Sequence, residues 1–168
     1  PDWQKGRTKP NVFYCYPNEC DRERFAKHIQ VPLDHVLTIR LSNDFIDKMG
    51  GDEDLYEKLG LMDTDYVGFY PAHLMPGKKA PEILMCVKAM VRNGMNVKYM
   101  FTANSMESGE AKTRLDSYKQ MAKDFGIEKN IIWLTDYVGP VTPYETVQKL
   151  WNITNLFIMP SDSETTSL

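Results

Sequence analysis

The chain has 168 residues, of which 42% are hydrophobic and 26% charged, which is enough apolar material for a folded core. A formal net charge of -3 argues against a general nucleic-acid binder, which usually carries an excess of basic residues. No apolar run has the length of a transmembrane helix, and no signal peptide is visible. The three cysteines lack the spacing of a zinc site. We therefore expect a cytoplasmic protein with free thiols.

The first part of the chain alternates strand, helix and strand. Residues 12–16 and 35–39 have strand-like patterns, and a helix is expected between them, from about Glu19 to Ile29. An acidic stretch with several glycines follows and contains one small helix that ends at Gly60. We therefore predict two domains, residues 1–46 and 65–168, joined by a linker at residues 47–64.

A longer alternation follows. Strands are predicted at residues 66–70, 97–102, 131–134 and 156–159, and helices at 82–93 and 109–125. A further helix is expected to begin at a capping box, Thr142 to Glu145, and to run to Trp151. The last strand has apolar residues on both faces and is therefore expected to be fully buried. Strands separated by helices predict an α/β fold with a Rossmann-like, doubly wound parallel sheet and right-handed crossovers.

Two loops at the carboxyl edge of this sheet have the composition of an anion site. Residues 71–79 follow the first strand and contain His73, Lys78 and Lys79, whereas residues 160–168 follow the fourth strand and include a helix start. No G-x-G-x-x-G or Walker pattern follows any predicted strand. The sequence thus favours a diphosphate site over a dehydrogenase-type dinucleotide site.

Residues 70–78 (Y-P-A-H-L-M-P-G-K) and residues 159–168 (M-P-S-D-S-E-T-T-S-L), together with two further motifs in the same order, resemble the retaining, family-4-type glycosyltransferases of GT-B architecture. The first is similar to the family's Y-P-x-R-L-x-P-x-K segment, and the second to the P-S-x-x-E-G-x-x-L stretch that opens its E-x7-E motif. Residues 134–141 resemble the L-x-G-x-V turn, and residues 17–22 with the strand at 35–40 resemble the end of the first Rossmann domain. The resemblance runs from about Val12 to Leu168.

The resemblance implies transfer of a sugar from a nucleotide-diphosphate donor to a sugar, glycan or glycolipid acceptor, with retention of configuration. It implies no catalytic metal and no cofactor besides the donor; the nucleotide, UDP or GDP, and any peripheral contact with a membrane stay open. The candidate residues it transfers to this chain are Glu164 for catalysis and the donor sugar, Thr165 for the sugar, His73, Lys78, Thr166 and Ser167 for the diphosphate, and Asp136, Tyr137 and Val138 for the base.

The sequence departs from the family pattern at three points. His73 replaces an arginine, Thr165 replaces a glycine, and the second glutamate of E-x7-E would follow Leu168. We therefore expect this piece alone to be at best weakly active. Glu164 could instead close a capping box with Ser161, and His73 and Lys78 could be ordinary loop residues. A non-catalytic nucleotide-binding module, or a fragment that serves as an interaction surface, are the alternatives.

Overall fold

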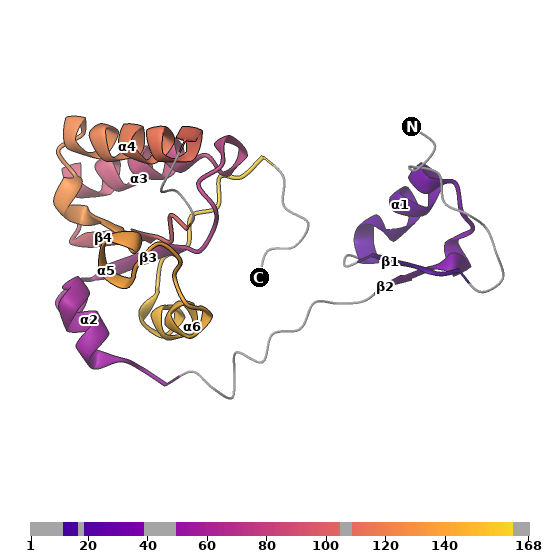
Figure 1. Cartoon of the computed structure of the whole chain (residues 1–168), viewed down its shortest axis with the longest axis horizontal. Helices are drawn as coiled ribbons and strands as arrows, with labels where there is room; N and C mark the ends of the chain where they lie inside the picture. The colour runs from indigo at the N-terminus through magenta and orange to yellow at the C-terminus, as the bar shows by residue number, and fades with distance from the viewer. Residues whose placement is uncertain (1–11, 17–18, 39–49, 105–108, 163–168) are drawn as a thin grey trace. The chain divides into compact units, whose positions relative to one another are not determined.

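The computed structural model describes residues 12–16, 19–38, 50–104 and 109–162 of the chain (Figure 1). These residues form two compact units. The first contains residues 12–16 and 19–38, and the second contains residues 50–104 and 109–162. The domain boundaries predicted from the sequence stay a prediction.

The first unit contains the predicted strand, helix and strand. Its elements are β1 (Tyr14–Tyr16), the 3-10 turn η2 (Glu19–Asp21), α1 (Arg22–Ile29), the 3-10 turn η3 (Leu33–His35) and β2 (Val36–Thr38). The strands are parallel, with Tyr14 opposite Val36. Ala26 and Ile29 of α1 are buried against Val36, which explains why the helix packs on this small sheet.

The second unit contains a parallel sheet in the order β3-β4-β5. Its strands are β3 (Tyr66–Tyr70), β4 (Val97–Phe101) and β5 (Ile131–Trp133), and its helices are α2 (Glu53–Leu59), α3 (Ala80–Arg92), α4 (Gly109–Asp124), α5 (Thr135–Val138) and α6 (Tyr144–Ile153), with 3-10 turns η4 (Pro76–Lys78) and η5 (Glu128–Asn130). All three strands lie where the sequence predicts them. The α/β fold class with a parallel sheet is thereby confirmed.

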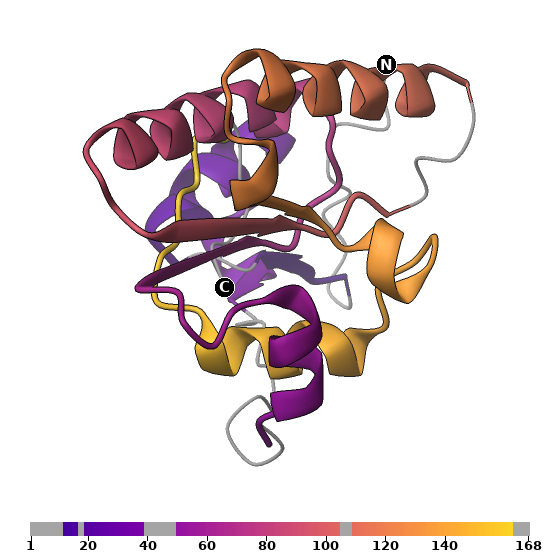
Figure 2. The same ribbon diagram turned by 90° about the vertical axis from the view of Figure 1, so that its left-hand side faces the viewer.

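Helices cover both faces of this sheet. Figure 2 shows α3 and α4 on one side of the strands and α2 and α6 on the other. The strand residues alternate between the two cores as the pleat requires: Tyr99 and Phe101 face α3 and α4, whereas Phe69 and Met100 face α2 and α6. The apolar faces predicted for the helices at 82–93 and 109–125 are the ones that the structure buries, including Ile83 and Leu115.

The segment predicted as a linker contains part of the second core. α2 begins at Asp52, whose Oδ1 accepts a hydrogen bond from the Leu55 N–H at 3.0 Å, and ends at Gly60, as the sequence predicts. Tyr56 and Leu59 are buried in the core beneath the sheet. Of the residues that suggested a linker, Asp52, Glu53 and Asp54 form the amino-terminal end of this packed helix.

The prediction of a fully buried fourth strand at residues 156–159 is wrong. The segment makes a single parallel bridge, Gly68 to Leu156, and its burial alternates, with Phe157 45% and Met159 40% exposed. Backbone hydrogen bonds join Asn155 and Leu156 to β3, and side chains add further bonds on either side of Leu156. The Asn155 carboxamide accepts from the Val67 N–H at 2.8 Å, and the Tyr99 hydroxyl binds the backbone of Ile158.

The capping box predicted at Thr142 is also wrong. Pro143 is the N-cap of α6, and no side chain caps that terminus. Thr142 is buried instead, where its hydroxyl donates to the Thr102 carbonyl at 3.5 Å and its N–H to Asn104 Oδ1 at 2.8 Å. Hydrogen-bond partners that lie far away in the sequence, Thr102 and Asn104, thus replace the partner expected within the first turn of the helix.

Candidate functional site

The sheet changes winding direction beside β3. The chain proceeds from β3 to β4 to β5 and then returns to the opposite side of β3, where Leu156 pairs with Gly68. Ligands of open α/β sheets bind outside the carboxyl ends of the strands at such a switch point. The loops after β3 and after Leu156 flank this point.

The loop after β3 is held in place by hydrogen bonds to its carbonyl groups. The Thr102 hydroxyl donates to the Ala72 carbonyl at 3.1 Å, and Arg114 Nη1 donates to the Leu74 carbonyl at 3.2 Å. The Leu74 side chain is buried. These contacts fix the backbone that presents His73, which is exposed, and Lys78, which is half-buried.

The loop after Leu156 lies directly against the loop after β3. The N–H of Asp162 donates to the Gly77 carbonyl at 3.1 Å, and the Ser161 hydroxyl donates to the same carbonyl at 3.3 Å. Lys79 and Asp162 form an ion pair. The adjacency of the two loops, expected from the sequence, is therefore present in the structure. The other candidate residues of the second loop, namely Glu164, Thr165, Thr166 and Ser167, lie outside the described residues.

The three residues predicted to flank a base form most of α5 but have different surroundings. The Asp136 carboxylate accepts two hydrogen bonds of 2.8 Å from the Lys119 ammonium. Tyr137 is 41% exposed, and its carbonyl accepts from Lys58 Nζ at 3.3 Å. Val138 packs against the core beside α2 and α6. Asp136 also lines a pocket.

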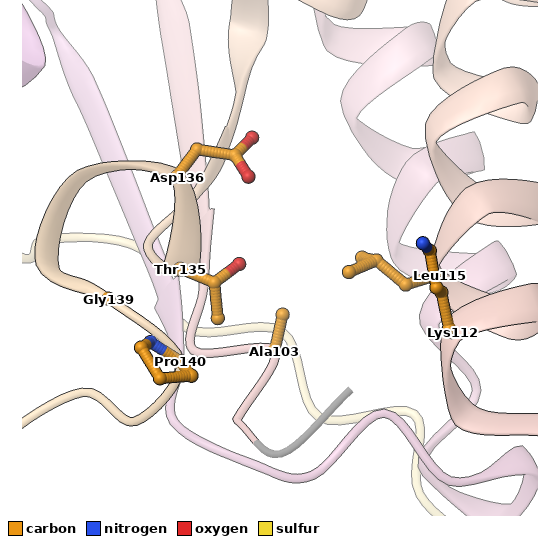
Figure 3. A pocket seen from close by; sticks show the side chains of 7 residues that line it. All are labelled: Ala103, Lys112, Leu115, Thr135, Asp136, Gly139 and Pro140. Carbon is orange, nitrogen blue, oxygen red and sulfur yellow. The ribbon is translucent and has the colours of Figure 1, made fainter. Parts of the chain in front are cut away.

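That pocket has a volume of about 310 Å³ and lies where β4 and β5 end (Figure 3). Its lining residues come from the turn after β4, from α4 and from the α5 region: Ala103, Lys112, Leu115, Thr135, Asp136, Gly139 and Pro140. The Thr135 hydroxyl oxygen is buried and has no hydrogen-bond partner in the part of the chain that the structure describes. A buried polar atom without a partner is unusual in folded proteins.

Ala103 forms part of the pocket wall in an uncommon backbone conformation. Its φ is +48°, in the left-handed region that non-glycine residues rarely adopt. The neighbouring Asn104 and Thr102 are both hydrogen-bonded to Thr142, which holds the turn from the other side. Sequence reasoning missed this turn, although the end of a predicted strand at a carboxyl edge was the signal that could have indicated it.

No helix among residues 12–16, 19–38, 50–104 and 109–162 is long and apolar enough to cross a membrane. The same residues contain no group of three or more His, Cys, Asp or Glu side chains that could hold a metal ion.

No model of a known protein family and no curated protein matches the sequence. Solved structures do match its fold. HepE (Alr3699) of Anabaena, solved in complex with UDP and also with UDP and glucose, superposes with a TM-score of 0.70 at 13% identity in both cases, over 90% of this chain. A glycosyltransferase from Rickettsia africae superposes with a TM-score of 0.67 at 10% identity, over 89% of this chain.

The chain spans about two fifths of those proteins, with 39% and 38% of the two HepE chains and 38% of the Rickettsia chain covered. At these identities the likeness concerns the fold. The Rossmann-like α/β architecture predicted from the sequence, of the kind found in GT-B glycosyltransferases, is confirmed.

Proposed function

We propose that this chain is part of a retaining glycosyltransferase of the GT-B type, related to family 4, which binds a nucleotide-diphosphate sugar at the carboxyl edge of its β3-β4-β5 sheet. The observation that supports it most is the meeting of two loops at the switch point, one with His73, Lys78 and Lys79 and the other with Ser161 and Asp162. The fold likeness to HepE, which binds UDP, supports a nucleotide as the ligand.

The cationic loop suits a leaving diphosphate. When the bond between sugar and diphosphate breaks, negative charge increases on the phosphate oxygens, and preorganised cations stabilise it. The Leu74 and Ala72 carbonyl groups are already engaged by Arg114 and Thr102, so the backbone beneath Lys78 needs little rearrangement. In this proposal, Glu164 and Thr165 contact the sugar, and Thr166 and Ser167 contact the phosphates.

The pocket beside α5 suits the base. Its volume of about 310 Å³ lies within the ordinary range of small-ligand pockets. Leu115 and Ala103 supply apolar wall, whereas Thr135 and Asp136 supply oxygen atoms at its edge (Figure 3). A nucleotide base is a planar ring with polar edges, so its faces match the apolar wall and its edges match the oxygen atoms.

The test is calorimetric titration with UDP of the wild type and of Lys78→Ala. We expect Lys78→Ala to weaken UDP binding about tenfold, because a hydrogen bond from a charged donor is typically worth about 1.5 kcal/mol or more. Lys129→Ala is the matched control, since Lys129 is an exposed lysine in η5, just before the amino end of β5. Equal UDP affinities for Lys78→Ala and Lys129→Ala would contradict the role of Lys78.

A non-catalytic nucleotide-binding module is the second candidate. It is favoured by His73, which lacks the permanent charge and the forked donors of an arginine. Release of UDP from UDP-sugars distinguishes the two candidates. A protein that binds UDP but releases none from a panel of UDP-sugars and acceptors, tested with the full-length parent, would be the module.

A further inference from the structure

The proposed function gives no individual role to Asp162 and Lys79, two charged residues of the loops that meet at the switch point. Their side chains form an ion pair although 82 residues separate them in the chain. The Asp162 N–H donates to the Gly77 carbonyl at 3.1 Å, so the carboxylate is held beside the loop after β3 and does not hang free. The ion pair therefore joins two loops whose backbones are also hydrogen-bonded to each other.

The backbone of Lys79 is also unusual. Its φ is +50°, and it is the N-cap of α3. Its N–H donates to the Pro76 carbonyl at 3.1 Å, and its carbonyl accepts from the Glu82 N–H at 3.1 Å. A non-glycine residue in this conformation is held by its surroundings, and such residues concentrate at functional sites. The hydrogen bond with Asp162 raises the pKa of the Lys79 ammonium, which keeps it charged.

We propose that the Asp162 carboxylate occupies the position of a donor phosphate at Lys79, and that diphosphate binding exchanges one anion for the other. The inference rests on the proposed function, because it concerns the same site. In the absence of a donor, Asp162 neutralises the charge of Lys79. When the diphosphate arrives, Lys79 turns to the phosphate and Asp162 moves away from it, since two anions on one ammonium repel each other.

Competition between the two anions lowers donor affinity. Part of the binding free energy of the diphosphate is used to break the Lys79–Asp162 pair. Exposed ion pairs are weak, so removal of the Asp162 charge should improve affinity by about two- to fivefold. A residue that merely holds the loop in place would have the opposite effect, because its loss would disorganise the site.

The experiment is a double-mutant cycle titrated with UDP and, separately, with inorganic pyrophosphate. We expect Asp162→Asn to bind both probes about two- to fivefold more tightly than wild type, and Lys79→Gly to bind them more weakly. The gain from Asp162→Asn should vanish in the Lys79→Gly background. Glycine adopts a φ of +50° without strain, so Lys79→Gly removes the charge and adds no backbone strain at this position.

Asp116→Asn is the control for net charge, since Asp116 is an exposed carboxylate on α4. Unchanged or weaker binding by Asp162→Asn, an equal gain in the Lys79→Gly background, or an equal gain from Asp116→Asn would overturn the proposal. If the wild type binds UDP and the variants give any of these results, the exchange of anions is overturned and the proposed function stands. A wild type that binds neither probe overturns both.

Discussion

The Tyr99 side chain connects the sheet to the segment that leads to Ser161 and Asp162. Its hydroxyl donates to the Ile158 carbonyl at 3.2 Å and accepts from the Ile158 N–H at 3.3 Å. The ring crosses β3 at Gly68, where a Cβ would lie 2.1 Å from Tyr99 Cδ2. Burial raises the pKa of the phenol well above its usual value, so the hydroxyl stays protonated and can donate.

We expect Tyr99→Phe to lower the free energy of unfolding by about 1–2 kcal/mol. Phenylalanine retains the ring, so no cavity forms, and the loss comes from two neutral hydrogen bonds worth roughly 0.5–1.5 kcal/mol each. Ile158 is only partly buried, so water recovers some of that loss. The estimate therefore lies below the full sum of the two bonds.

Urea denaturation followed by tryptophan fluorescence measures this change. Trp133 and Trp151 both lie in the second unit, and a Trp3→Phe background removes the remaining tryptophan. Tyr118→Phe is the control, because Tyr118 is a buried tyrosine of the same core whose hydroxyl makes no hydrogen bond to another described residue. If Tyr99→Phe destabilises the protein no more than Tyr118→Phe does, the two hydrogen bonds contribute nothing and the reasoning is refuted.

Three further variants test other contacts. Gly68→Ala should cost at least about 2 kcal/mol in the same denaturation assay, because the added Cβ forces the Tyr99 ring out of place; a loss below about 0.5 kcal/mol would contradict the close approach. His73→Arg should bind UDP several-fold more tightly at pH 8 by calorimetry, since arginine stays charged there, and equal affinity would exclude this side chain from the site. Two hydrogen bonds lower the pKa of the Asp52 carboxyl, first the one from Lys149 and then the one from the Leu55 N–H. The ionised carboxylate of Asp52 therefore stabilises the fold above about pH 4, and this stabilisation is lost as the pH falls through the folded-state pKa. Asp52→Asn should therefore flatten the decline in melting temperature between about pH 5 and 3, and a parallel decline in both proteins would show that the pair does not matter.

The sequence by itself determined the positions of the three strands and of the longer helices in the second unit. β3, β4 and β5, and the buried faces of α3 and α4, follow from apolar periodicity, which depends only on residues close together in the chain. Strands that alternate with helices then imply a parallel sheet, and its carboxyl edge implies where loops converge. That much of the candidate site was predictable for the same reason.

Contacts between distant residues decided the rest. The apolar residues at 156–159 predict a buried strand, yet the backbone pairing with β3 is limited to a bridge at Leu156, and the Tyr99 hydroxyl binds the backbone of Ile158 instead. The pocket beside α5 depends on the left-handed turn at Ala103, and Lys79 meets Asp162 only because the chain returns beside β3. No local pattern contains these partners, since each contact joins segments that only the folded sheet brings together.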